Sequence, residues 1–320
     1  MSGTPGLFLL LLSTAVWGQT AAPAPVQDPD QTPPTVTTLK VVTGLVAISA
    51  VVKSKDGEAQ SSLSKDDFVL KQDGKEEPIT YFSRGSELPL SLALMVDTSA
   101  SQRTFVGDET LASDVFFETM LGHTGDRATL VQFDTTVMQL KTMTNSANAL
   151  HLALSHLNSR ASDAGGTLLY DAVYVVAKSV LANEKGRKAM VILSDGGDNG
   201  SRRSLAEAIE QAQRGDVQIY AILYSMWDGS SGTGSHTAID PGLEALRKLS
   251  ESTGGRVFTV SRAMSLRDIY SQIGDDLRLQ YELGYKPPPD TKPDSYHKLE
   301  LKAKDKKLTV QARKGFFEPP

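Results

Sequence analysis

From Leu90 to Leu279 the sequence alternates between short apolar runs and longer segments with helical spacing. Apolar runs of strand length predict buried strands, and apolar residues three and four positions apart predict helices. We expect strands at 90–96, 128–133, 188–193, 217–223 and 256–260, and helices at 108–121, 147–157, 168–181, 205–213, 242–250 and 266–279. This order predicts a doubly wound, mostly parallel α/β sheet of the Rossmann-like kind, with helices on both faces.

The segments on either side, 36–87 and 281–320, have patterns typical of strands. We expect strands at 39–52, 67–71, 79–82, 280–285, 297–303 and 307–312, with a tight turn at 72–74 joining the strands at 67–71 and 79–82. Each segment alone is too small to bury a good core. We therefore expect the two to pair into a small β-sandwich, with the α/β domain (88–280) inserted in it or flanked by it.

The chain begins with an apolar run at Leu7–Trp17, which is shorter than the roughly 20 residues that a membrane-spanning helix needs. Its length fits the core of a signal peptide, so we expect a signal peptide at 1–18 and a flexible Pro-rich linker at 19–35. The lack of Lys and Arg in residues 1–6 departs from the usual pattern, and an uncleaved apolar anchor or a disordered tail is the alternative. We then expect the mature chain to be exported, to the periplasm, the medium or the cell surface, without a transmembrane segment.

Composition excludes several classes of function. A hydrophobic content of 40% with 22% charged residues fits a globular protein, and the formal net charge of -5 gives no electrostatic case for binding nucleic acid. The sequence contains no cysteine, which excludes disulfides, thiolate metal sites and thiol nucleophiles.

Three short motifs place oxygen-bearing side chains at the ends of predicted strands or before a predicted helix. They are Asp-x-Ser-x-Ser at 97–101, Gly-Gly-Thr at 165–167 and Ser-Asp-Gly at 194–196. Taken singly, such residues are more often helix caps or turn residues. Ligands of open α/β sheets bind beyond the carboxyl ends of the strands, and hard divalent cations prefer oxygen ligands. The candidate metal ligands are Asp97, Ser99, Ser101, Thr167 and Asp195.

These motifs, in this order, resemble the metal-ion-dependent adhesion site of von Willebrand factor type A domains, over roughly residues 88–280. The resemblance implies that Ser99, Ser101 and Thr167 contact the metal directly or nearly so. It implies that Asp97 and Asp195 act mainly through water, and that a partner's carboxylate completes the coordination. The strand-rich segments before and after the α/β region look like those of a bacterial subclass of exported, related proteins.

The mixture of hydroxyls and carboxylates favours capture of an acidic ligand, because neutral ligands leave the metal much of its positive charge. We expect a non-enzymatic adhesion or assembly module that holds Mg²⁺, or Mn²⁺ or Ca²⁺, and binds a protein ligand presenting Asp or Glu. Gly166, Gly196 and Trp227 are candidates for the partner-binding loops, although a packing role for Trp227 is as good an interpretation.

Two alternatives remain. One is a structural scaffold whose metal site does not function. The other is a metal-dependent hydrolase, since Asp97-Thr98-Ser99 superficially resembles an Asp-x-Asp loop, but Ser99 stands where the second acid is needed. The sequence has no Gly-x-Ser-x-Gly elbow, no phosphate-binding glycine loop and no general-base His near the motif. Asp198-Asn199-Gly200 resembles a calcium loop only faintly, because the terminal Glu is missing.

Overall fold

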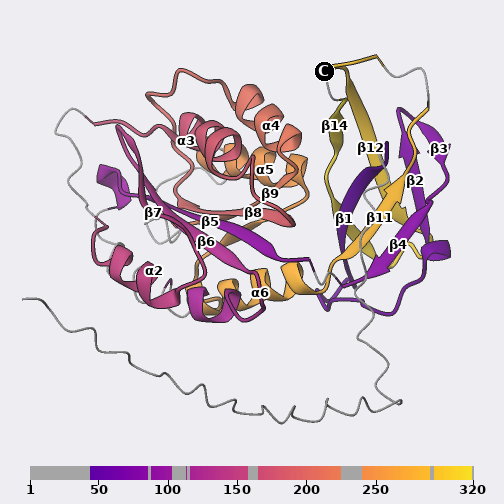
Figure 1. Ribbon diagram of the computed structural model, residues 1–320, viewed down its shortest axis with the longest axis horizontal. Helices are drawn as coiled ribbons and strands as arrows, with labels where there is room; N and C mark the ends of the chain where they lie inside the picture. Colours follow the sequence, from indigo (N-terminus) through magenta and orange to yellow (C-terminus); the bar gives the residue numbers. More distant parts are fainter. Residues whose placement is uncertain are drawn as a thin grey trace, which may run out of the picture. The chain divides into compact units, whose positions relative to one another are not determined.

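The computed structural model describes residues 44–85, 88–102, 113, 116–157, 165–224, 240–288 and 292–318 of the chain (Figure 1). The predicted signal peptide, the linker and Trp227 lie outside these residues, as does half of the predicted helix 108–121. None of the helices in the described ranges is both long and apolar enough to cross a membrane.

The central feature is a six-stranded sheet in the order β10-β9-β8-β5-β6-β7. Its strands are β5 (Leu90–Asp97), β6 (Arg127–Phe133), β7 (Val137–Thr144), β8 (Arg187–Ser194), β9 (Val217–Leu223) and β10 (Val257–Thr259). All neighbours are parallel except β6 and β7, which pair antiparallel with a register irregularity. The predicted doubly wound, mostly parallel α/β sheet is confirmed. Strand β7 was not predicted, because this half-exposed edge strand has no apolar run.

Helices cover both faces of this sheet, as Figure 1 shows. On one face lie α2 (Ala147–Leu154), α6 (Leu266–Arg278) and the helical residues 116–120. On the other lie α3 (Leu169–Val175, continued by a π-helical turn at Val176–Val180), α4 (Leu205–Arg214) and α5 (Pro241–Thr253). Successive residues of β5 point to opposite faces, so that Leu92 and Leu94 join one core while Ala93 and Met95 join the other.

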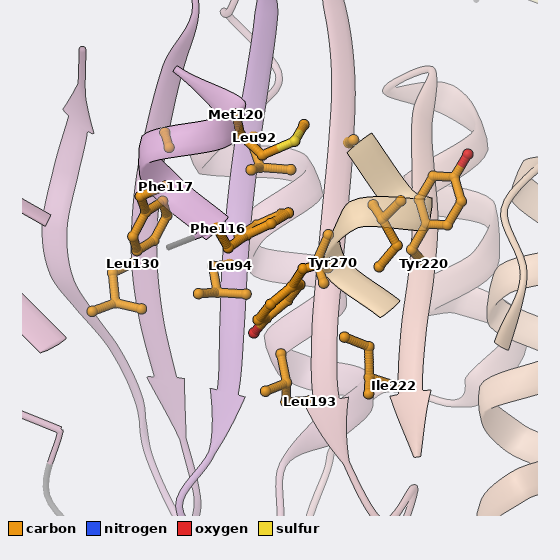
Figure 2. Packing of buried hydrophobic residues seen from close by; sticks show 14 of the residues in the cluster. Leu92, Leu94, Phe116, Phe117, Met120, Leu130, Leu193, Tyr220, Ile222 and Tyr270 are labelled. Carbon is orange, nitrogen blue, oxygen red and sulfur yellow. The ribbon is translucent and has the colours of Figure 1, made fainter. Parts of the chain in front are cut away.

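The core beneath α6 contains large side chains from several elements (Figure 2). The rings of Phe116 and Tyr270 stack with their centroids 4.2 Å apart, above Leu94 and Leu193 of the sheet. Helix starts are fixed by local chemistry. Ser204 caps α4, because its hydroxyl accepts the N–H of Glu207 while the Glu207 carboxylate accepts the Ser204 N–H.

The flanking segments form two four-stranded antiparallel sheets, in the orders β13-β1-β11-β4 and β14-β12-β2-β3. Their strands are β1 (Val46–Lys53), β2 (Phe68–Gln72), β3 (Lys75–Glu77), β4 (Tyr81–Arg84), β11 (Tyr281–Tyr285), β12 (Tyr296–Ala303), β13 (Thr309–Ala312) and β14 (Gly315–Phe317). N-terminal strands pair with C-terminal ones, β1 with β11 and β2 with β12, and the two sheets share one core. The predicted β-sandwich built from both segments is therefore present.

The predicted turn at 72–74 exists, but its partner strand was predicted wrongly. Asp73 and Gly74 both have positive φ, 50° and 85°, which makes a two-residue hairpin from β2 to β3. The strand predicted at 79–82 is instead β4, which pairs with β11 in the other sheet. Pro78 stands between β3 and β4, and a proline has no N–H to continue a ladder.

Buried charges join the sandwich to the α/β region. Asp276 of α6 is almost fully buried and contacts Lys53 of β1 at 2.6 Å and Arg256 at 2.9 Å. A cavity of about 90 Å³ lies between strands of both regions. Its lining includes Ser49, Arg187, Asp216, Glu282 and Arg313.

Candidate functional site

Asp97 is the last residue of β5 and is fully buried. Its Oδ1 accepts the N–H of Ser99 at 2.9 Å, which turns the chain sharply after the strand. Its Oδ2 accepts the hydroxyl of Ser194 at 2.6 Å, and that hydroxyl in turn accepts the N–H of Gly196 at 2.9 Å. The carboxylate is therefore held at both oxygens and fastens the carboxyl ends of β5 and β8 together.

The electrostatics of this carboxylate favour a cation. Burial raises the pKa of Asp97 to about 6, against the opposing effect of the hydrogen bonds from Ser194 and Ser99. The negative charge of Asp195 raises this pKa further, so the two carboxylates of the predicted site lie within electrostatic reach of one another. A divalent cation between them would offset both the repulsion and the loss of hydration.

The two serines of the first motif are brought together. Their Oγ atoms lie 3.2 Å apart and share a hydrogen bond, with Ser99 buried and Ser101 exposed in the middle of a short 3₁₀ turn, Ala100–Gln102. The N–H of Thr98 donates to Phe133 O at the end of β6, which fixes the loop to the neighbouring strand. The Ser99 hydroxyl thus lies beside the buried Asp97 carboxylate, while Ser101 is exposed to solvent.

Thr167 lies just before α3 on a loop that is held from two sides. Its N–H donates to Asn199 Oδ1 at 2.7 Å and its carbonyl accepts the N–H of Asn199 at 3.1 Å. The next residue, Leu168, donates to Asp134 O beyond the end of β6. Because β5 lies between β6 and β8, these contacts carry the loop across the end of the strand that bears Asp97. Leu168, and not Thr167, is the N-cap of α3, so the buried Thr167 hydroxyl is not used as a cap.

Glycines set the backbone around the second and third motifs. A Cβ on Gly166 would lie 2.9 Å from Thr135 Cγ2, and one on Gly196 would lie 2.2 Å from the carbonyl oxygen of Gly242 at the start of α5. Gly196 is buried and has a φ of 80°, and its backbone packs so closely against Gly242 that no side chain fits. Asp195, half-buried beside it, accepts the N–H of Gly197 at 2.9 Å.

Two supporting residues were missed from the sequence. Ser194 holds Asp97, and it could have been found as a polar residue at the end of an otherwise apolar strand. Asn199 holds Thr167 from a distance of 32 positions, and no local pattern indicates that role. Asp198, weighed as a calcium ligand, accepts the Tyr170 N–H and the Ser201 hydroxyl and so anchors the loop.

The candidate site therefore offers two carboxylates and three hydroxyls on loops near the carboxyl ends of β5 and β8. Within the described ranges, no three His, Cys, Asp or Glu side chains gather closely enough to hold a metal ion. A cation bound here would depend on Ser99, Ser101 and Thr167 as well as on Asp97 and Asp195. Trp227, proposed for a partner-binding loop, lies outside the described residues.

Residues 91–272, more than half of the chain, match the family model of the von Willebrand factor type A domain. The protein belongs to the von Willebrand factor type A domain family. A search among curated proteins finds no match.

Solved structures with a similar fold share little sequence with this chain. BatB from Bacteroides thetaiotaomicron is 12% identical over 59% of this chain and 97% of its own, with a TM-score of 0.46. The vWF domain of the type V pili tip protein Mfa5 from Porphyromonas gingivalis is 14% identical over 59% and 94%, with a TM-score of 0.45. Proximal thread matrix protein 1 from the mussel byssus, solved with a zinc-occupied MIDAS motif, is 14% identical over 61% and 49%, with a TM-score of 0.45. At these identities the likeness concerns the fold alone.

Proposed function

We propose that this protein is a metal-ion-dependent binding module, in which Mg²⁺ at the end of β5 captures a carboxylate of a protein partner. One observation carries the proposal: the buried carboxylate of Asp97 is held at both oxygens, by Ser99 N–H and Ser194 hydroxyl, beside the charge of Asp195. Building such an arrangement costs desolvation free energy, and a bound cation would offset that cost. Membership of the von Willebrand factor type A family supports the same interpretation.

The chemistry assigns different tasks to the two kinds of side chain. Ser99, Ser101 and Thr167 offer neutral oxygens, which hold a hard cation without cancelling its charge. Asp97 and Asp195 supply the negative potential that draws the cation in, acting mainly through water. The cation keeps enough charge to attract an Asp or Glu side chain of the partner, and the surrounding loops select among partners.

We propose no enzymatic step at this site. The described residues around Asp97 supply hydroxyls and carboxylates, but no histidine is hydrogen-bonded to Ser99, Ser101 or Thr167 to act as their general base. The signal peptide expected at 1–18 supports a binding function outside the cytoplasm.

Calorimetric titration of chelator-treated protein with Mg²⁺, Mn²⁺ and Ca²⁺ tests the proposal. We expect saturable binding to the wild type and its loss in Asp97→Ala and Ser99→Ala. The matched control is Ser155→Ala, which removes an exposed hydroxyl at the end of α2. Because a partner's carboxylate is expected to complete the site, each titration is repeated with a short peptide carrying one Asp. A wild type that binds no cation in either condition would overturn the proposal.

A further inference from the structure

The loop that holds Thr167 contains a chemically labile dipeptide. Asn199 is followed by Gly200, and none of the other four asparagines, at 145, 148, 158 and 183, precedes a glycine. Asn199 is exposed in an irregular loop between β8 and α4. A glycine leaves the following backbone nitrogen unhindered, since it has no Cβ to restrict approach or rotation of the peptide unit.

Contacts around Asn199 prepare this dipeptide for an internal reaction. The N–H of Thr167 donates to Asn199 Oδ1 at 2.7 Å. That oxygen is the atom on which negative charge develops when a nucleophile adds to Cγ, and a fixed N–H donor there stabilises the charge as an oxyanion hole does. In the described part of the chain, the N–H of Gly200 donates to no acceptor, so no hydrogen bond holds this nitrogen back.

We propose that Asn199 is a site of spontaneous deamidation that changes the charge of the metal-binding loop. The backbone nitrogen of Gly200, after losing its proton to water, forms a bond to Asn199 Cγ. The Cγ–Nδ2 bond then breaks, and Nδ2 leaves as ammonia with a proton taken from water. The resulting cyclic imide adds one water molecule and opens at either carbonyl, giving aspartate or isoaspartate. The net change consumes one water, releases one ammonia and involves no oxidation or reduction.

The product carries a new carboxylate beside Thr167, and what this does to the cation rests on the proposed function. Asp195 and Asp198 already lie in the same loop, so one more negative charge shifts the site from neutral hydroxyl ligands toward carboxylates. A more neutralised cation is held more tightly and attracts a partner's carboxylate less. Deamidation would therefore switch the site from capturing a partner toward retaining its metal.

The reaction itself is measured without any metal. Purified protein is incubated in mildly alkaline buffer in its folded form and in denaturant, and peptides are followed by mass spectrometry for the exchange of an amide for an acid. We expect the Asn199 peptide to change first, and to change in the folded protein at least as fast as in the denatured chain. Conversion that is slower in the folded form than in denaturant would show that the Thr167 hydrogen bond protects the amide, and would overturn the proposal.

Two substitutions serve as controls for the reaction. Asn199→Gln keeps an amide but must close a larger ring, and Gly200→Ala adds a Cβ that would meet only the end of the Leu168 side chain, at 2.9 Å. Both should strongly slow the mass change at this position while leaving the fold intact, as judged by circular dichroism. An undiminished rate in Gly200→Ala would contradict attack by the backbone nitrogen of residue 200.

Asn199→Asp copies one product and tests its consequence. We expect this variant to bind Mg²⁺ about tenfold more tightly and a single-Asp peptide more weakly. A tenfold change in Mg²⁺ affinity is about what one added charge causes when several ångströms of partly solvated protein separate it from the ion. If the mass change occurs but Asn199→Asp binds Mg²⁺ and peptide like the wild type, the proposed switch is wrong although the modification stands. If the wild type binds no metal at all, the proposed function fails while the mass measurement still decides the modification.

Discussion

Ser194 donates its hydroxyl proton to Asp97 Oδ2 across 2.6 Å, and this single hydrogen bond joins the ends of two neighbouring parallel strands. Both residues are fully buried, so neither can turn to water for another partner. The position of the Asp97 carboxylate therefore depends on a residue outside the five proposed ligands.

Replacing Ser194 by Ala should weaken both the fold and the proposed metal site. A buried carboxylate that loses one hydrogen bond costs about 2 kcal/mol of unfolding free energy. Denaturant unfolding measures this loss, and calorimetry with Mg²⁺ should show weaker binding than in the wild type. Ser155→Ala is the matched control and should change neither quantity appreciably. An unchanged Mg²⁺ affinity in Ser194→Ala would show that Asp97 needs no such support.

Gly196 should tolerate no side chain. Alanine there must adopt a φ of 80° and place its Cβ 2.2 Å from Gly242 O, so the loop has to move. We expect Gly196→Ala to lower the free energy of unfolding by about 3 kcal/mol and to abolish metal binding. The neighbouring Gly197→Ala is the control, because its Cβ would meet only Asp195 Oδ1, at 3.2 Å. Equal thermal stability of the two variants would contradict the close packing of this loop against α5.

Asp276 should contribute strongly to the attachment of α6. Its side chain is 1% exposed and pairs with Lys53 and Arg256, which retain some contact with solvent. Asp276→Asn should cost about 2 kcal/mol of unfolding free energy, less than for a fully buried pair because both cations can partly rehydrate. Denaturant unfolding checks this value. Glu300→Gln breaks a surface pair with Lys302 and should have little effect, so a similar loss in both variants would argue against the buried pair.

Glu282 should make stability depend on pH. Burial raises the pKa of Glu282 from 4.5 to about 7, and the negative charge of Asp216 adds to this increase. Hydrogen bonds from Ser49 and the positive charges of Arg187 and Arg313 oppose it. Between these two pKa values the folded protein keeps a proton that the unfolded chain has released. Stability contributed by this group is therefore present at low pH and is lost as pH rises from 4.5 to about 7, by about 2 kcal/mol after allowance for partial exposure.

Unfolding measured across this pH range tests the effect of Glu282. The variant Glu282→Gln keeps a polar group for Ser49 but cannot ionise, so it should lose this pH dependence and exceed the wild type in stability at mildly alkaline pH. Glu300→Gln again serves as the control and should retain the wild-type slope. A wild-type slope in Glu282→Gln would assign the dependence to another group.

The α/β core could be predicted because its strands are buried on both faces. β5, β8 and β9 are continuous apolar runs, and such runs are visible in a single sequence. Strand β7 could not be predicted, because much of it is exposed to solvent and its pairing with β6 is irregular. The strand at 79–82 was given the wrong neighbour, because a turn signal shows where a chain reverses but not which strand follows in the same sheet.

The residues of the candidate site also differ in whether the sequence predicts them. The five proposed ligands stand in local motifs, each beside a strand end or a helix start. The supporting roles of Ser194 and Asn199 do not show in these motifs, although Ser194 stands in one, because the two residues act across 97 and 32 positions of sequence. Such contacts depend on which strands become neighbours, and that information lies in the assembled sheet.

The pairing of β4 with β11 sets Arg84 opposite Tyr281, so the chain leaves the sandwich and returns to it at adjacent positions of one ladder. For the sandwich, everything between these two residues amounts to a single, very long hairpin loop, and the free-energy cost of closing a loop grows only slowly with its length. The α/β region is in this sense an insertion between two paired strands of the sandwich. Changes in the length of its surface loops should therefore leave the register of β4 and β11 unchanged.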